Sequence, residues 1–127
     1  MRAGELLNEY AEGQRARGYS TWAVVEKASA RTVGDAGFEI YKPTGEPELG
    51  YTLAADVWGR GYATEAARAC VAAAFEHLSV QRIVAKVEIG NDRSMQVAER
   101  LGMRRIDTIE LHGRPHVLLA LQRTDLR

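Results

Sequence analysis

One helical segment that lies between two strand-like segments limits the folds open to this chain. Apolar residues recur at spacings of three and four from Ala63 to Leu78, which predicts an amphipathic helix. The segments at 48–54 and 82–89 alternate apolar and polar residues, as half-buried strands do. Strands that are joined through a helix run parallel, so the three segments predict a strand–helix–strand crossover within a sheet.

Antiparallel strands are predicted on both sides of this crossover. Their β-prone runs lie at 21–26, 32–41, 103–111 and 115–122. The turn signal Lys-Pro-Thr-Gly-Glu-Pro at 42–47 ends the second of them. Further helices are predicted at 4–17 and at 91–101, the latter with Gly102 as its C-terminal stop. The expected fold class is therefore α+β, a mixed α/β sheet covered by helices.

The composition fits one packed domain over residues 1–127. The 127 residues are 46% hydrophobic, which is enough to bury a core without disulfides. Seventeen basic residues balance 17 acidic ones, which argues against general nucleic-acid or membrane-surface binding. The N-terminus has no apolar signal core, and we expect a cytoplasmic protein. The single cysteine, Cys70, falls in the apolar helical pattern and is expected to be a core residue rather than a nucleophile.

The segment 57–66, Val-Trp-Gly-Arg-Gly-Tyr-Ala-Thr-Glu-Ala, carries the strongest chemical signal. Gly59 and Gly61 permit a tight turn directly before the clearest helix. The N–H groups of a first helical turn have no intrahelical partner, so they attract an anion such as a phosphate, and Arg60 adds a cation. The chain has no Gly-Lys-Ser or Gly-Lys-Thr and no third glycine after Gly61 at dinucleotide-fingerprint spacing. A P-loop and a dinucleotide fingerprint are therefore excluded.

Residues 58–66 resemble the acetyl-coenzyme A signature of the GNAT acetyltransferase superfamily. They are most similar to its branch of ribosomal-protein N-terminal acetyltransferases, called RimJ/RimL-like. Gly61 and Ala63 match the last two anchors of the general pattern Q/R-x-x-G-x-G/A, whereas Trp58 stands where Gln or Arg is usual. Glu48-Leu-Gly-Tyr resembles the strand before this signature, and Asn91-Asp-Arg-Ser with Glu-Arg-Leu-Gly-Met resembles the later cofactor helix. The resemblance covers roughly residues 20–123.

This resemblance implies a GNAT-like acyl-CoA N-acyltransferase fold whose cofactor-binding core spans about 48–103. It implies an acetyl-CoA-dependent N-acetyltransferase that acts on a primary amine, either a protein N-terminus or a small amine. The implied cofactor-binding residues are Val57, Trp58, Gly59, Arg60, Gly61, Tyr62, Ala63, Asn91 and Ser94. No metal site is expected, because His112 and His116 are too few and too isolated.

The resemblance also suggests which residues perform the chemistry. Ala98 stands where many superfamily members have a tyrosine general acid, so Ser94 is the substitute candidate. Glu48, at the start of its strand, is the candidate base, and Glu88 is the alternative. Both carboxylates could equally be solvated surface groups, and Asn91 could be only a helix N-cap.

The N-terminal part of the chain departs from the family pattern. GNAT domains usually have another strand and helix before the helix predicted here at 4–17, so we expect the chain to lack both. The missing strand would leave an open sheet edge, which favours a homodimer that covers it. Since the missing pieces often line the acceptor pocket, the alternative function is a coenzyme A-binding module with weak or no catalysis.

Overall fold

The computed structural model describes residues 6–10 and 21–125, and within them seven strands form one sheet in the order β1-β2-β3-β4-β5-β7-β6. The strands are β1 (Leu6–Tyr10), β2 (Thr21–Glu26), β3 (Arg31–Tyr41), β4 (Glu46–Leu53), β5 (Arg82–Glu88), β6 (Arg104–Leu111) and β7 (Arg114–Gln122). The helices are α1 (Tyr62–His77) and α2 (Asp92–Leu101), with the 3₁₀ turns η2 (Ala55–Val57) and η3 (Arg123–Asp125). Neighbouring strands are antiparallel except β4 and β5, which are parallel. The predicted mixed sheet is confirmed.

The helix predicted at 4–17 is wrong over Leu6–Tyr10, which form β1, while 4–5 and 11–17 lie outside the described residues. Strand β1 pairs antiparallel with β2 from Leu6 opposite Glu26 to Tyr10 opposite Trp22. Helical spacing in so short a segment is weak information, and the free edge of β2 offers backbone partners that override it. The strand expected to be missing from this edge is thus present as β1. The homodimer loses that argument and stays a prediction.

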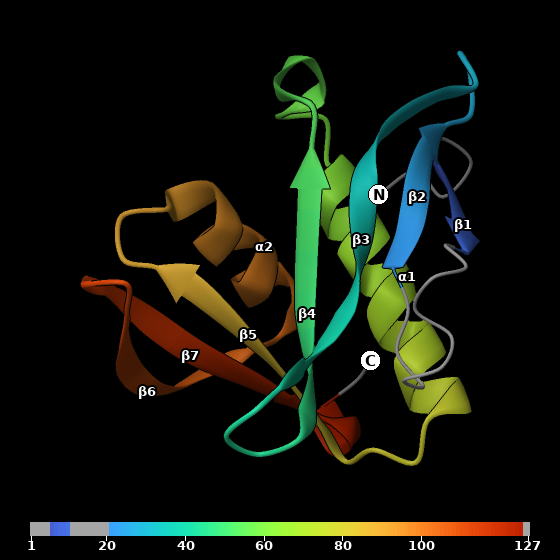
Figure 1. Ribbon diagram of the computed structural model, residues 1–127. Helices are drawn as coiled ribbons and strands as arrows, with labels where there is room; N and C mark the ends of the chain where they lie inside the picture. Colours follow the sequence, from blue (N-terminus) through green and yellow to red (C-terminus); the bar gives the residue numbers. More distant parts are fainter. Residues whose placement is uncertain (1–5, 11–20, 126–127) are drawn as a thin grey trace.

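Helices α1 and α2 pack on the same face of the sheet, and the core lies between them and the strands (Figure 1). Small side chains let α1 approach the sheet closely, since Ala66, Ala67, Cys70 and Ala74 are no more than 3% exposed. Burial raises the pKa of the Cys70 thiol to about 12, so it is not a thiolate at neutral pH. The expected core position of Cys70 is confirmed. Among the described helices, none is both long and apolar enough to span a membrane.

The sheet opens between β4 and β5. These strands share a single register pair, Glu48 with Val84, whereas β3 and β4 pair from Gly34–Leu53 to Tyr41–Glu46. Beyond Glu48 the two parallel strands diverge toward their C-terminal ends, and the start of α2 lies beside the wide end of the opening (Figure 1). The crossover predicted from the sequence is confirmed, and its two strands form the edges of a gap in the sheet.

An ion pair holds the narrow end of this opening. Arg82 of β5 donates from Nε and Nη2 to the two carboxylate oxygens of Glu46 of β4, and both donor–acceptor distances are 2.7 Å. The side chains of Arg82 and Glu46 are 27% and 24% exposed, so solvent screens the contact only in part. The hydrogen bonds from Arg82 are the main reason that the pKa of Glu46 is lowered.

Replacing Arg82 should expose this contribution to stability. We expect Arg82→Met to lower the free energy of unfolding by about 1–2 kcal/mol at pH 7. Because the pKa of Glu46 is lower in the folded than in the unfolded chain, the pair stabilises the fold above the ordinary glutamate pKa of about 4.3 and loses that effect as the pH falls through the native value. Urea unfolding should therefore show the difference from wild type shrinking below pH 4. A difference that stays constant down to pH 3.5 would contradict this assignment.

Candidate functional site

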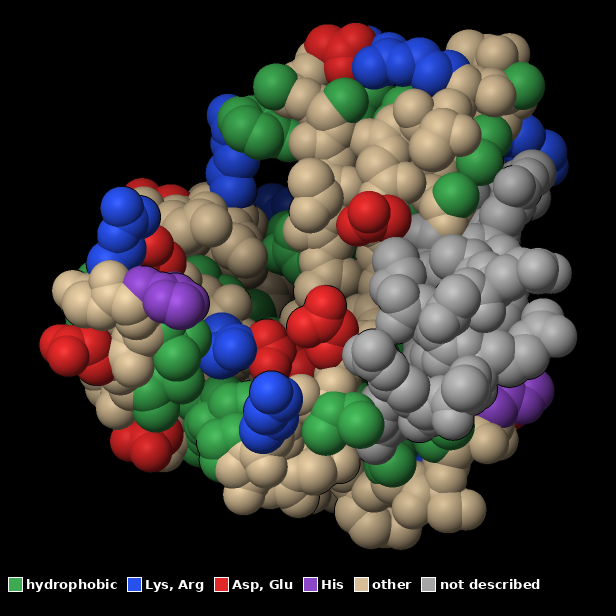
Figure 2. Space-filling model, in the orientation of Figure 1, with side chains coloured by type: hydrophobic (Ala, Val, Ile, Leu, Met, Phe, Trp, Pro, Cys, Tyr) green, Lys and Arg blue, Asp and Glu red, His purple; other side chains and the backbone are tan. Residues whose placement is uncertain are grey.

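The connection from β4 to α1 and the first turns of α2 form two walls of a cleft of about 720 Å³. The face drawn in Figure 2 is hollowed between the upper part of β4 and α2, where this cleft opens. The cleft brings together these predicted cofactor-binding residues: Val57, Trp58, Gly59, Gly61, Tyr62, Ala63, Asn91 and Ser94. Arg60 is not among the lining residues. Segments separated by a whole crossover thus converge on one cavity, as the resemblance implied.

The wall before α1 presents backbone N–H groups. Gly59 and Gly61 have φ of +84° and +80°, a left-handed conformation that glycine adopts without strain. No side chain caps the start of α1. The first hydrogen bond within the helix runs from the N–H of Glu65 to the carbonyl of Gly61, at a donor–acceptor distance of 3.0 Å. The N–H groups of Ala63 and Thr64 precede that bond, at the positive end of the helix dipole. This arrangement suits an anionic ligand such as a pyrophosphate.

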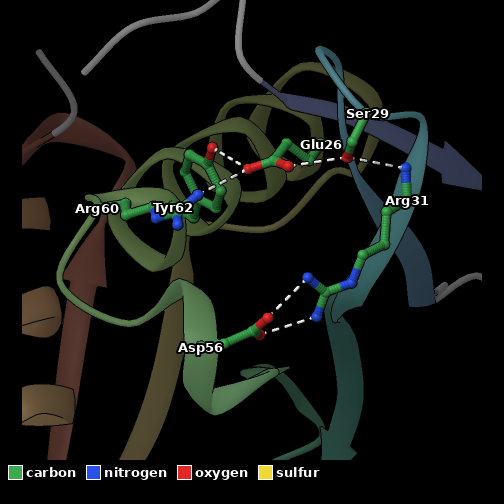
Figure 3. A network of polar contacts seen from close by, with 6 residues as sticks. All are labelled: Glu26, Ser29, Arg31, Asp56, Arg60 and Tyr62. Atoms are coloured by element: carbon green, nitrogen blue, oxygen red, sulfur yellow. Dashed lines mark hydrogen bonds and ion pairs between the residues drawn. The ribbon is translucent and has the colours of Figure 1, made fainter.

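Arg60 lies on Glu26 rather than along the cleft. Its Nη1 atom is 3.1 Å from Oε2 of Glu26, at the end of β2 (Figure 3). The same carboxylate accepts a hydrogen bond from the Tyr62 hydroxyl at a distance of 2.5 Å and one from the Ser29 hydroxyl at 2.8 Å. These bonds, that of Tyr62 above all, lower the pKa of Glu26. Glu26 therefore stays ionised at neutral pH as the shared acceptor of the loop.

A second ion pair ties the same two regions together. Arg31 of β3 donates from both terminal nitrogens to the carboxylate of Asp56 in η2, and both donor–acceptor distances are 2.8 Å (Figure 3). The two contacts, Arg31 with Asp56 and Glu26 with Arg60 and Tyr62, fasten the β2–β3 turn to the loop before α1. The loop is thus held in shape by side chains from a distant hairpin, which reduces the ordering that a ligand would have to impose.

The wall at α2 begins with a helix cap. The Oδ1 atom of Asn91 accepts a hydrogen bond from the N–H of Ser94 over 3.2 Å. Asn91 therefore caps α2, as the plainer interpretation predicted, and it also lines the cleft. Across the cleft, the guanidinium of Arg93 lies 4.3 Å from the ring centroid of Trp58. The Trp58 Nε1 donates a hydrogen bond to the carbonyl of Leu53 at a distance of 3.0 Å. Sequence spacing does not reveal this link between the two walls.

A hydroxyl pair lies where the cleft meets the opening between β4 and β5. The Tyr51 hydroxyl and Ser94 Oγ are 3.0 Å apart, and either can donate. Both residues line the cleft and also a slot of about 160 Å³ between the two diverging strands. Burial raises the pKa of Tyr51, although the bond with Ser94 opposes this, so the phenol keeps its proton at neutral pH. Ala98, where many family members have a tyrosine, lines the same slot.

Glu48 lines the slot, but its carboxylate is paired. Its Oε2 atom lies 3.2 Å from Nζ of Lys86, and the side chains are 20% and 26% exposed. Leu49 and Leu53 of β4 face the helices, so Glu48 belongs to the opposite face of the strand. Figure 2 shows acidic and basic side chains gathered on that face around β4 and β5. Glu88, the alternative base, accepts a hydrogen bond from Arg114 at 3.3 Å and lines a different groove. Of the two candidate bases, Glu48 is therefore the one that shares a cavity with Ser94.

Comparison with known proteins places this cleft in a family context. Residues 2–104 match a family model described as the acetyltransferase (GNAT) domain. Two curated relatives are an uncharacterised protein, YkkB, of Bacillus subtilis, 32% identical over 87% of the chain, and an uncharacterised N-acetyltransferase, p20, of Bacillus licheniformis, 31% identical over 80%. The chain spans 66% and 56% of their lengths.

A solved structure matches the fold as well. The ribosomal-protein-S5-alanine acetyltransferase from Vibrio fischeri aligns with a TM-score of 0.78 over 90% of this chain and 67% of its own. At 19% sequence identity, this likeness shows a common fold and carries no information on the acceptor. The assignment to the ribosomal-protein branch therefore stays a prediction.

Proposed function

The chain belongs to the acetyltransferase (GNAT) family, and on that premise we propose that it transfers an acetyl group from acetyl-CoA to a primary amine. One observation carries the proposal: the uncapped start of α1, with two left-handed glycines before it, forms a wall of a cleft that leads to the gap between β4 and β5. An uncapped helix start suits a pyrophosphate, and the narrow slot beyond it suits a thin acyl-bearing arm. The residues present therefore fit acetyl-CoA.

Each wall of the cleft has its own part in this proposal. The backbone of 57–63 would hold the pyrophosphate, with Asn91 and Ser94 on the opposite wall. Because β4 and β5 pair only at Glu48 and Val84, the backbone of β4 beyond that point faces the slot, where an N–H group can polarise a thioester carbonyl. Ser94 would protonate the departing thiolate, at the meeting point of the cleft and the slot.

The acceptor amine would enter from the face that carries Glu48. Its ammonium must lose a proton before it can attack, and Glu48 is the carboxylate that shares the slot with Ser94. Lys86 at 3.2 Å would have to release that carboxylate or let a water relay the proton. The acceptor is a protein N-terminus or a small amine. The name of the p20 relative supports N-acetylation and leaves open which of these it is.

Calorimetric titration with acetyl-CoA, followed by an assay of free thiol release, tests the proposal. The acceptors would be a short peptide with a free N-terminus, a set of amino acids and a polyamine. Binding with thiol release that depends on one of them would support the transferase. Binding without transfer to any acceptor would favour the alternative, a coenzyme A-binding module. A folded chain that does not bind acetyl-CoA would overturn both functions.

The ion pair of Arg60 leads to a prediction about the same titration. We expect Arg60→Ala to weaken acetyl-CoA binding by less than about threefold. Glu26 holds this guanidinium outside the lining of the cleft, and without it the loop keeps the Tyr62–Glu26 and Arg31–Asp56 contacts, since one exposed ion pair contributes little to stability. Arg104→Ala is the matched control, since Arg104 is an exposed arginine of β6 that does not line the cleft. A loss of tenfold or more for Arg60→Ala alone would mean that the guanidinium leaves Glu26 for a phosphate.

A further inference from the structure

We propose that Tyr51 and Ser94 act as one proton-donating unit, in which the Tyr51 phenol supplies the proton that restores Ser94 after each transfer. This inference rests on the acetyl transfer proposed above and adds a residue to it. In the sequence, Tyr51 stood out only as the last residue of the segment Glu48-Leu-Gly-Tyr, and the family's usual tyrosine position holds Ala98. The structure brings a phenol from β4, that of Tyr51, to Ser94, whereas the family's usual tyrosine would lie on α2.

The position of the pair supports this role. The cleft and the slot share three lining residues, Tyr51, Ser94 and Val97, and only the first two carry hydroxyl groups. A thioester that reached from the cleft into the slot would pass the 3.0 Å contact between those hydroxyls. Asn91 orients Ser94 through the N-cap, and the β4 strand orients Tyr51, so both partners sit on rigid elements.

The chemistry of the two hydroxyls is complementary. The hydroxyl of a serine is a far weaker acid than a phenol, so an alkoxide left on Ser94 needs a nearby donor. A phenol has an ordinary pKa of about 10, much closer to that of a thiol at about 8.5. Since Tyr51 is partly buried and keeps its proton at neutral pH, it can serve as that donor. Its direct bond to Ser94 allows the proton to move without an intervening water.

The transfer balances in atoms and charge. The amine nitrogen bonds to the acetyl carbon, the carbon–sulfur bond breaks, and the sulfur takes the proton of Ser94 Oγ. Ser94 Oγ takes the proton of Tyr51, and the Tyr51 oxygen takes one from solvent. The acceptor ammonium releases one proton before it attacks and a second as the amide forms, to the solvent directly or through Glu48. Two protons are released and one is taken up, so the products are the acetylated amine, the free thiol and one proton in solution. No oxidant or reductant is involved.

The test compares two acetyl donors, acetyl-CoA and S-acetyl-4-nitrothiophenol, whose aromatic thiolate is stable without a proton. We expect Tyr51→Phe to lower kcat with acetyl-CoA by about a hundredfold, with the calorimetric affinity for acetyl-CoA unchanged within twofold. With the aromatic thioester the rate should fall by less than about threefold. The double variant Tyr51→Phe/Ser94→Ala should be no slower than the slower single variant, since both act in one step. Tyr41→Phe, a tyrosine on the opposite face of the sheet, is the matched control.

Three outcomes distinguish the inference from the function on which it rests. Equal losses for both donors would show that Tyr51 has only a structural role and would overturn the proposed unit. An active wild type with an unaffected Tyr51→Phe variant would also overturn it, while leaving the acetyl transfer intact. A wild type that binds acetyl-CoA but transfers from neither donor would overturn the transfer and the unit together.

Discussion

A Gly61→Asp variant should bind acetyl-CoA at least about a hundredfold more weakly than the wild type, a change of about 2.8 kcal/mol, and should remain folded. Gly61 is the N-cap of α1, and its position has no capping side chain. Aspartate is among the best N-cap residues, so its carboxylate would bond the N–H groups that we assign to the pyrophosphate and would repel the phosphates as well. The capping bond would partly offset the cost of a left-handed aspartate, so the fold should survive.

Gly45 offers a matched control for this variant. It has φ of +77°, close to the +80° of Gly61, and an added Cβ at either glycine would meet no atom within 4 Å. Gly45→Asp therefore introduces the same charge at the same backbone strain, but in the β3–β4 turn and not at the cleft. Calorimetry should find its affinity for acetyl-CoA within twofold of wild type. If Gly45→Asp and Gly61→Asp weakened binding equally, the anion site would not lie at the start of α1.

Removing the side chain of Arg123 should have the largest effect on stability. Its guanidinium donates hydrogen bonds to three carbonyls at and beyond the end of α1. The donor–acceptor distances are 2.6 Å to Phe75, 2.9 Å to Leu78 and 3.0 Å to Val80. The guanidinium carbon also lies 5.2 Å from the centroid of the Phe75 ring. A cation at a helix C-terminus is favoured by the helix dipole, and this one satisfies carbonyls that the helix leaves open.

We expect Arg123→Met to lower the free energy of unfolding by about 2–4 kcal/mol, because partly buried carbonyls lose charge-assisted bonds that water replaces incompletely. Arg123→Lys keeps the charge but reaches fewer carbonyls, so it should lose about half as much. Urea unfolding monitored by circular dichroism measures both. Arg104→Met, at an arginine whose side chain is 77% exposed, should change the same quantity by less than about 0.5 kcal/mol. An Arg123→Met variant as stable as this control would show that water serves the three carbonyls equally well.

Local patterns predicted most of the described elements. The helical spacing of 63–78 and the alternation of 82–89 appear as α1 and β5, and the glycine stop at Gly102 ends α2 with a left-handed φ of +91°. The prediction failed at 4–17, where five described residues pair with β2 as a strand. A long amphipathic helix identifies itself because its own residues make the pattern, whereas a short edge strand depends on what its neighbour offers.

The candidate site divides in the same way. The sequence was enough to predict the loop before α1, since two glycines directly before a helical pattern permit a tight turn and the first helical N–H groups have no intrahelical partner. It also determined the Asn91 cap, whose bond to Ser94 spans only three residues. Both features depend on backbone groups and on side chains that are neighbours along the chain.

The contacts between distant segments follow from the way the sheet and helices pack. The single pairing of β4 with β5 opens the slot, and the arrangement of β4 and α2 around it brings the Tyr51 hydroxyl to Ser94. The same packing turned Arg60 toward Glu26, away from the cleft that its place in the signature suggested. A side chain's partner depends on which strands meet and where they diverge, and that depends on packing of the whole sheet, which no local pattern records.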